Sequence, residues 1–380
     1  MASAGPRVLF PTPVAAVPVM RYKRGDQDGE RGGAMVGNAR INGLGVRAAV
    51  WGLLALLGCG PALANDSTGF LGTGGIELAR TDAIEMRSED LRIGLDEIRV
   101  SYVFRNVTDK PVDTLVAFPL PDIDLSRGLT EAAWGFPQQV DDFLGFRLWI
   151  DDQPVQPALE RRAIFKGRDV TDRVAAAGAL ALVPWAAGAY DQIAKTLDPA
   201  ALARLRADGL IQAGEDDNTP QWRLRARYHW RQIFPPGRDV RVRHVYRPFV
   251  GTALIGRVAS IDGRKAVGRY LGDRPDPSGD RYCLDAATRR TLAAAQAKHP
   301  PPAMPYSAAE IEYIVTTARN WRGPIGRFHL TIDKGAPDNL VSLCWNGLTK
   351  TGPTTFESTI TDFVPDRDIR LLVFVRSQAP

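Results

Sequence analysis

The sequence has few of the residues from which most catalytic and metal sites are built. Its 380 residues include three cysteines and four histidines, and the histidines are scattered through the second half of the chain. No histidine or third cysteine lies at ligand spacing around Cys283 or Cys344, which argues against a zinc site. The motifs G-x-S-x-G, H-E-x-x-H and S-x-x-K are absent as well. The sequence therefore predicts no catalytic residues, no metal and no cofactor.

The apolar run near the N-terminus is too short to span a membrane. It extends from Ala48 to Gly60, about 13 residues, whereas a spanning helix needs about 20. Basic residues precede it, and Ala62-Leu63-Ala64 follows as a small-x-small cleavage site. We therefore expect residues 35–64 to be a signal peptide cut between Ala64 and Asn65. The alternative is a disordered tail followed by a membrane anchor.

This interpretation makes Met35 the start and residues 1–34, rich in Pro, Gly and Arg, a non-native or disordered extension. The mature chain would be periplasmic or secreted, without a transmembrane segment. One alternative stays open, because Leu56-Leu57-Gly58-Cys59 approximates a lipoprotein site that would be acylated on Cys59.

The expected export favours a disulfide bond between the two remaining cysteines. Once Cys59 is removed with the signal, Cys283 and Cys344 remain, and an oxidising compartment favours a disulfide between them. Closing a loop of about 60 residues would stabilise the fold by about 4 kcal/mol in the chain-entropy model. Two unlinked buried thiols are the alternative.

The net charge of +5 gives no evidence of nucleic-acid binding. Residues 1–64 hold seven Lys and Arg but three Asp and Glu, so the chain after the predicted cut is close to neutral. We therefore expect no nucleic-acid partner.

Alternation of apolar and polar residues predicts a β-rich body. Ile98, Val100, Tyr102 and Phe104 recur at every second position, which places them on one face of a strand. Leu91, Ile93 and Leu95 also alternate, but with the opposite parity, which requires a bulge or a tight turn near Asp96-Glu97. After a turn at 106–111, Val112 to Leu120 returns as a second, antiparallel strand.

The remaining chain divides by composition. An N-terminal β region (65–158) precedes an Ala-rich helical insertion (159–218), and a C-terminal β-rich region (219–380) follows. The helices predicted from caps and composition are Asp172–Ala177, Gln192–Leu197, Pro199–Asp208 and Asp285–Lys298. The predicted fold is thus mainly β, with antiparallel β-sandwich-like sheets, a helical insertion around 160–213 and a further helix near 285–298.

A concentration of arginine is the candidate binding site. Eight arginines lie between positions 223 and 247, against a single acid, Asp239. If Leu224, Tyr228 and Trp230 face the core, the arginines of that strand share the opposite face, and those beyond the turn at Pro235-Pro236-Gly237 can join them. The predicted anion-binding set is Arg223, Arg225, Arg227, Arg231, Arg241 and Arg243. Two interpretations remain open, namely neutralisation by carboxylates of this chain and binding of an external phosphate or carboxylate.

Several segments resemble the bacterial domain of unknown function 4424 (DUF4424) family. They are Asn65-Asp66-Ser67, Gly74-Gly75, Ile84–Leu91, Tyr102–Asn106, Phe118–Pro121, Pro235–Gly237, Val245-Tyr246, Asn320–Ile325, Leu343–Trp345 and Lys350–Glu357. The resemblance implies an exported protein without an assigned activity. A weaker similarity, in the strand that ends at Asn106 and in Phe118–Pro121, is to the vault/inter-alpha-trypsin type β domain, which would imply adhesion or interaction.

Together these features predict an exported, non-catalytic protein that binds an envelope component or an acidic partner. The alternative is a periplasmic hydrolase whose active site forms only in the folded chain. The sequence predicts neither the ligand nor the oligomeric state.

Overall fold

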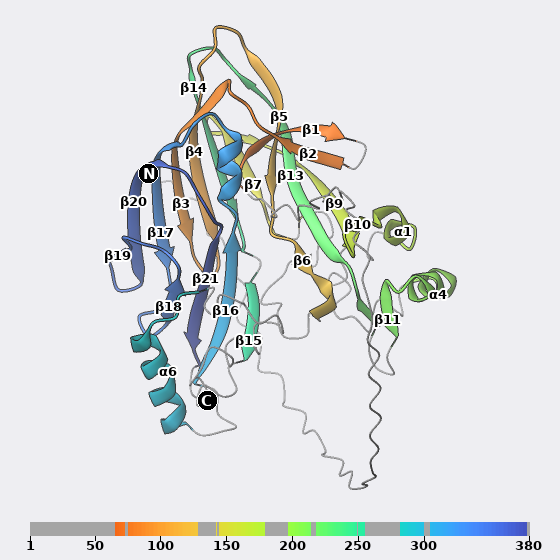
Figure 1. Cartoon of the computed structure of the whole chain (residues 1–380), viewed down its shortest axis with the longest axis vertical. Helices are drawn as coiled ribbons and strands as arrows, with labels where there is room; N and C mark the ends of the chain where they lie inside the picture. The colour runs from red at the N-terminus through yellow and green to blue at the C-terminus, as the bar shows by residue number, and fades with distance from the viewer. Residues whose placement is uncertain are drawn as a thin grey trace, which may run out of the picture. The chain divides into compact units, whose positions relative to one another are not determined.

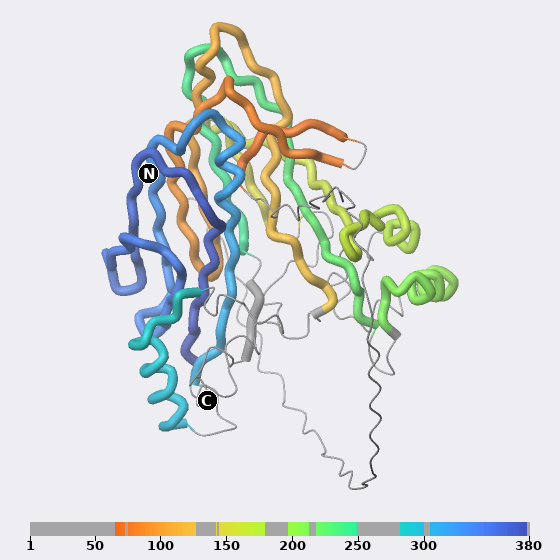
Figure 2. Tube along the Cα trace, in the orientation of Figure 1, coloured from red at the N-terminus to blue at the C-terminus, as the bar shows by residue number. Residues whose placement is uncertain are grey.

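The structure, a computed structural model, describes residues 65–72, 75–127, 142, 144–178, 197–213, 218–248, 250–254, 282–299 and 305–377 (Figures 1 and 2). These residues belong to one compact unit. The predicted extension (1–34) and signal peptide (35–64), including Cys59 and Ala64, lie outside the described residues, and so does most of the helix predicted at 192–197.

Sheet A is built around β13, which pairs with neighbours on both sides. The strand order is β10 (Arg168–Asp169), β9 (Ala158–Phe165), β13 (Arg223–Phe234), β5 (Val112–Pro119), β1 (Ser67–Gly72) and β2 (Gly75–Ala79), with β6 (Ile123–Asp124) also on β13. Leu224, Ala226, Tyr228 and Trp230 alternate inward along β13 and are buried, as the sequence predicts.

Sheet B brings strands from both ends of the chain together. Its order is β19 (Thr349–Lys350), β20 (Thr355–Phe363), β17 (Ile325–Asp333), β3 (Ile84–Ile93), β4 (Ile98–Asn106), β14 (Asp239–Tyr246), β7 (Arg147–Ile150) and β8 (Gln153–Val155). β3 and β17 pair in parallel, whereas the other strand pairs of this sheet are antiparallel.

Two smaller sheets and the helices complete the described fold. Sheet D consists of β15 (Val250–Leu254), β16 (Tyr306–Tyr313), β21 (Ile369–Arg376) and β18 (Leu340–Leu343), and sheet C of β11 (Ile211–Ala213) and β12 (Asn218–Pro220). The helices are η1 (Leu125–Arg127), α1 (Thr171–Ala175), α4 (Pro199–Ala207), α6 (Ala286–Lys298) and η4 (Thr316–Asn320).

Sheets A, B and D meet in one hydrophobic core. Phe118 of sheet A lies 4.9 Å from the ring of His244 in sheet B and 6.4 Å from the ring of Tyr313 in sheet D. Trp321, directly after η4, packs at 4.6 Å from Phe104 of β4. The mainly β, antiparallel fold predicted from sequence is confirmed.

Two predicted hairpins are wrong in the same way. β4 and β5 were expected to pair across the turn at 106–111, and β13 and β14 across Pro235-Pro236-Gly237, but each pair divides between sheets A and B. Buried Asn106 links the two crossings, because its Nδ2 donates to the Phe234 carbonyl at 2.8 Å and its own carbonyl accepts from Gly237 N at 3.0 Å. Alternation predicts which face of a strand is apolar, but it does not predict which strand lies beside it.

The helical insertion begins later than predicted. Residues 158–169 form β9 and β10, because β13 offers an open edge that β9 pairs with antiparallel from His229 to Arg223. The helices near 172, 199 and 286 are present, and Asp198 and Asp285 cap α4 and α6 as expected, each accepting a backbone N–H through its carboxylate. None of the helices in the described ranges has the length and apolarity to cross a bilayer.

Candidate functional site

The arginines of β13 are neutralised within sheet A. Acidic residues on the neighbouring strands β5, β6 and β9, and just before β6, face the same side as these arginines. The ion pairs are Arg223–Asp124 at 3.8 Å, Arg225–Asp122 at 3.0 Å, Arg227–Glu160 at 3.3 Å and Arg231–Asp113 at 2.8 Å. Arg225 and Arg231 each use two guanidinium nitrogens. This is the intramolecular alternative left open by the sequence.

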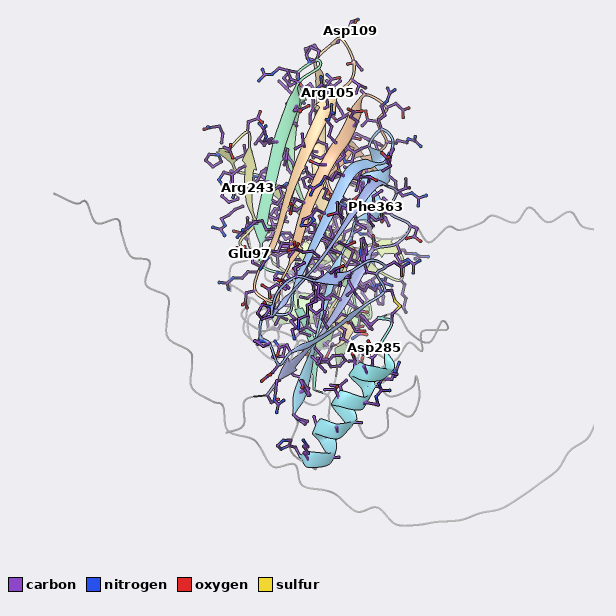
Figure 3. All side chains as sticks on the ribbon, turned by 90° about the vertical axis from the view of Figure 1, so that its left-hand side faces the viewer. Glu97, Arg105, Asp109, Arg243, Asp285 and Phe363 are labelled. Atoms are coloured by element: carbon purple, nitrogen blue, oxygen red, sulfur yellow. A yellow bond between two sulfur atoms is a disulfide. The ribbon has the colours of Figure 1, made fainter. Side chains whose placement is uncertain are left out.

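The arginines of β14 belong to a different surface. Because β14 lies in sheet B, Arg241 and Arg243 are on the outer face of that sheet and do not extend the β13 set, so the predicted single face across a strand pair is wrong. Figure 3 looks onto this part of sheet B, with Arg243 and Arg105 labelled. The backbone N–H of Arg241 donates to Asp151 Oδ1 at 2.9 Å. Neither the Arg241 nor the Arg243 guanidinium forms an ion pair with a carboxylate among the described residues, in contrast to the β13 arginines.

Arg243 instead contacts an aromatic ring. Its guanidinium carbon lies 3.9 Å from the centre of the Trp149 ring, and that of Arg147 lies at 5.9 Å. The register explains the contact, because Trp149 of β7 is directly opposite Arg243 of β14, and Ser101 of β4 is opposite Arg243 on the other side. Arg147 shares Glu97 with Arg99, at 3.9 and 2.7 Å. We call Arg241, Arg243 and Trp149 the β14 basic site.

The β14 basic site is suited to hold an anion. A guanidinium group stacked on an indole keeps its N–H donors free to bind carboxylate or phosphate. Trp149 and Arg243 are half-buried and Arg241 is exposed, so an external ligand can reach them.

The second polar cluster is in the core and was missed by sequence reasoning. Its members are Asn65, Asp66, Glu89, Tyr102, His244 and Tyr313, at most 1% exposed. Glu89 accepts hydrogen bonds from Asn65 Nδ2 at 2.9 Å and from the Tyr313 hydroxyl at 3.2 Å, and the Tyr313 and Tyr102 hydroxyls are 2.9 Å apart. We call these six residues the buried acid cluster.

A bulge in β3 places Glu89 in the core. The register between β3 and β4 shifts between Met86 and Ser88, so inward positions change from Ile84 and Met86 to Glu89, Leu91 and Ile93. The available signal was parity, since Glu89 is in phase with Leu91, and His244 is in phase with Val242.

Burial perturbs the titration of this cluster. Burial raises the pKa of Glu89 to about 8, and the hydrogen bonds from Asn65 and Tyr313 offset part of this increase. Burial, and secondly the charge of Glu89, raises the pKa of Asp66 well above its usual range. The pKa of His244 is lowered to about 3 by burial. Among the described residues, both oxygens of Asp66 and both ring nitrogens of His244 lack hydrogen-bond partners, and His244 Nε2 lies 3.6 Å from Asp66 Oδ1.

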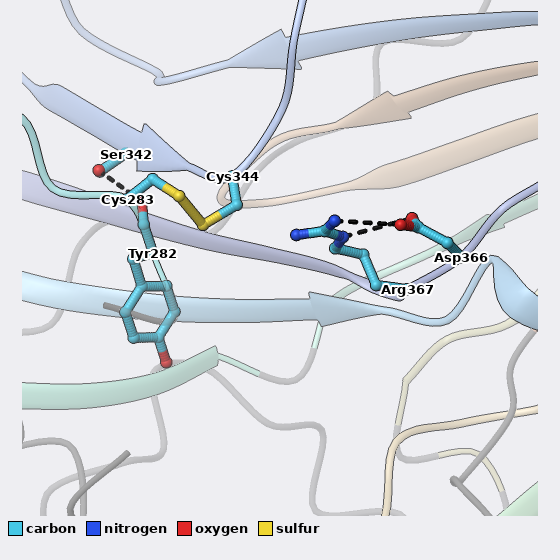
Figure 4. Close-up of a disulfide and its surroundings, with 6 residues drawn as sticks. All are labelled: Tyr282, Cys283, Ser342, Cys344, Asp366 and Arg367. Carbon is cyan, nitrogen blue, oxygen red and sulfur yellow. Dashed lines mark hydrogen bonds and ion pairs between the residues drawn. A yellow bond between two sulfur atoms is a disulfide. The ribbon is translucent and has the colours of Figure 1, made fainter. Parts of the chain in front are cut away.

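The other predicted sites are placed as follows. Cys283 and Cys344 form a disulfide with a Cα–Cα distance of 5.0 Å, as expected (Figure 4). Asn65, predicted to follow the cleaved bond, is part of the buried acid cluster, whereas Ala64 lies outside the described residues. Within the described part of the chain, no group of three or more His, Cys, Asp and Glu side chains could hold a metal ion.

Solved structures similar to this chain include the following three. A candidate nutrient binding protein from Legionella pneumophila is 14% identical, with a TM-score of 0.42, over 82% of this chain and 70% of that one. A two-domain M1 zinc metallopeptidase bound to L-tryptophan is 10% identical, with a TM-score of 0.26, over 80% of this chain and 45% of that one. An M1 zinc metallopeptidase from Deinococcus radiodurans is 9% identical, with a TM-score of 0.23, over 78% of this chain and 43% of that one. The match thus spans less than half of each peptidase.

No curated protein matches the chain. The family model described as a domain of unknown function (DUF4424) matches residues 64–372. That range contains both the β14 basic site and the buried acid cluster, and the family resemblance expected from sequence is confirmed. The chain belongs to the DUF4424 family.

Proposed function

We propose that this protein is exported and acts as a non-catalytic binding protein, which holds the anionic group of an envelope component at the β14 basic site. The observation that carries the proposal is the contrast between two sets of arginines. The guanidinium groups on β13 are paired with carboxylates, whereas those of Arg241 and Arg243 form no ion pair within the described residues. A guanidinium that this chain leaves without a carboxylate is available for an external one.

The hydrolase alternative has less support. Acid, histidine and tyrosine side chains do converge in the buried acid cluster, but Glu89, Asp66 and His244 are fully buried. A general acid or base must come within hydrogen-bond reach of its substrate. A substrate could reach the buried acid cluster only if the fold opened, whereas the β14 basic site is already open to solvent.

Binding to isolated cell-envelope fractions tests the proposal. The double variant Arg241→Ala/Arg243→Ala should bind roughly 100-fold more weakly, because each charge-assisted hydrogen bond contributes about 1.5 kcal/mol or more and 1.4 kcal/mol is a factor of 10. Wild-type binding should also weaken as salt is raised from low to physiological concentration.

The matched control is Arg223→Ala/Arg231→Ala, which removes the same charge from sheet A. This control should bind like the wild type, and circular dichroism should show that both variants are folded. Undiminished binding by the β14 variant, or an equal loss in the control, would contradict the proposal, since net charge alone would then account for binding.

A further inference from the structure

The buried acid cluster contains two carboxyl groups but no cation. Asp66 precedes β1 and Glu89 is on β3, and both are fully buried. The titratable groups that face them are Tyr102 of β4, His244 and Tyr246 of β14, and Tyr313 of β16. Burial keeps His244 neutral by lowering its pKa to about 3. No lysine or arginine forms an ion pair with Asp66 or Glu89 among the described residues, so these acids lack a counter-ion.

Asn65 and Asp66 are held in the core by β3, by η4 and by Trp321 directly after η4. The Asn65 side chain donates to Glu89 Oε2 at 2.9 Å. The Asn65 carbonyl accepts from Thr317 Oγ1 in η4 at 2.8 Å, and the Asp66 carbonyl accepts from Trp321 Nε1 at 2.5 Å. Four covalent bonds separate the α-nitrogen of Asn65 from the amide nitrogen that contacts Glu89, and Asp66 is the next residue, so a charge on the α-nitrogen would lie within about 8 Å of the Glu89 carboxyl group.

Asn65 is also the residue that follows Ala62-Leu63-Ala64. Hydrolysis of the Ala64–Asn65 peptide bond would consume one water and leave a carboxylate on Ala64 and a protonated α-amino group on Asn65. The bond that export would cut is therefore the one whose cleavage creates a positive charge on the residue whose side chain donates to Glu89.

We propose that the α-ammonium group of Asn65, created when the signal peptide is removed, is the missing counter-ion of Glu89 and Asp66. Removal of the signal peptide would then not only release the chain but also supply the positive charge that balances the two buried carboxyl groups. The inference rests on the export proposed above and is independent of the β14 basic site.

The proposal changes the expected dependence of stability on pH. With an amide at Asn65, Glu89 has a folded pKa of about 8 against an ordinary value of 4.5. A raised folded pKa means that stability falls as pH rises between these two values. With an ammonium at Asn65, the charged carboxylate is favoured and its pKa falls. The ammonium pKa rises in turn, so the pair stabilises the fold at neutral pH and is lost only at more alkaline pH.

The test uses the chain exported by a bacterial host and cut by its signal peptidase. Mass spectrometry should show Asn65 as the first residue. Labelling of the folded protein with an amine-acetylating reagent should modify exposed Lys110 and Lys298 but leave the Asn65 amine unmodified until urea unfolds the chain. A different first residue would contradict the proposed export and cleavage. An Asn65 amine that reacts as fast as Lys110 would contradict this inference alone.

A matched variant separates charge from burial. One alanine inserted between Ala64 and Asn65 moves the ammonium outward by one residue and keeps every core side chain. The urea midpoint of the wild type should hold steady between pH 5 and 8, whereas that of the insertion variant should decline over the same range. Glu89→Gln should reduce the difference between the two N-termini to the part that Asp66 contributes, and if this variant does not fold, the comparison of the wild type with the insertion variant still tests the proposal. Identical declines in the wild type and the insertion variant would overturn the proposal.

Discussion

Breaking the disulfide should destabilise the fold by an amount set by the loop it closes. Cys283 and Cys344 are separated by 61 positions, and in the chain-entropy model a loop of about that length removes roughly 14 cal/mol/K from the unfolded chain, or about 4 kcal/mol at 25 °C. The bond joins the segment before α6 to the end of β18, as Figure 4 shows together with the hydrogen bond from Ser342 Oγ to the Tyr282 carbonyl.

The bond also fastens a second hydrophobic cluster. Leu292 of α6 packs with Tyr282 and Leu284 against Tyr306, Leu372 and Phe374 of sheet D. Without the bond, the contacts that hold α6 on the sheet include this small cluster, the Ser342 hydrogen bond and the hydrogen bond from the Tyr282 hydroxyl to Glu310 of β16. Loss of the disulfide should therefore release α6 before the sheets unfold, because few apolar contacts give a low local opening free energy.

The assay is urea unfolding of the oxidised protein, the reduced protein and the double variant Cys283→Ser/Cys344→Ser. With an m-value of about 3 kcal/mol/M, the midpoint should fall by about 1.3 M in the last two. Cys283 is exposed and Cys344 half-buried, so serine adds little burial cost of its own. Reductant should not change the double variant. A loss below about 1 kcal/mol would refute the reasoning, because the loop would then be constrained in the unfolded chain by something other than the bond.

Three further substitutions test local features by thermal and urea unfolding. Asp198→Ala removes the N-cap of α4 and should cost about 1 kcal/mol, while Asp198→Asn should restore most of it. Gly326→Ala should cost roughly 1–3 kcal/mol, because the added Cβ would lie 2.6 Å from the backbone oxygen of Arg87 in the β3 bulge, and no measurable loss would show that the bulge can move. Asn106→Ala should cost roughly 2–4 kcal/mol by leaving the carbonyl of Phe234 without its donor at the crossing between sheets, and a loss as small as that of a surface substitution would contradict this role.

Local features of the fold could be predicted because they depend on neighbouring residues. The parity change between Leu91 and Ile98 does mark a tight turn, in which Gly94 N donates to the Glu97 carbonyl at 3.0 Å. Asp198-Pro199 and Asp285 do begin helices. A pair of cysteines in a chain of this composition does form one bond.

Sheet membership could not be predicted from the same signals. β4 and β5 have the alternation and the connecting turn of a hairpin, but they separate into two sheets because Asn106 satisfies the backbone at the crossing. The sequence predicts that β9 belongs to an Ala-rich helical region. It forms a strand instead because it pairs with the edge of β13. Such long-range pairing overrides local propensity.

The candidate sites divide in the same manner. The arginine concentration was visible in the sequence, but its carboxylate partners came from β5, β6, β9 and the segment before β6, so only the placement of strands could separate paired from unpaired arginines. Glu89 and His244 each had the parity of a buried position, yet their meeting with Asp66 depends on three separate strands and segments.

The parallel pairing of β3 with β17 has a consequence for biogenesis. Arg327 to Ile332 of β17 lie beside Ser88 to Ile93 of β3. β3 is therefore synthesised more than two hundred residues before the strand with which it pairs in parallel. Until that partner arrives, one edge of β3 exposes unpaired backbone groups on a nascent polypeptide, the kind of edge on which chains aggregate. We expect slow maturation, dominated by this non-local closure, and dependence on a holding chaperone that shields the early strands until the last third of the chain has been delivered.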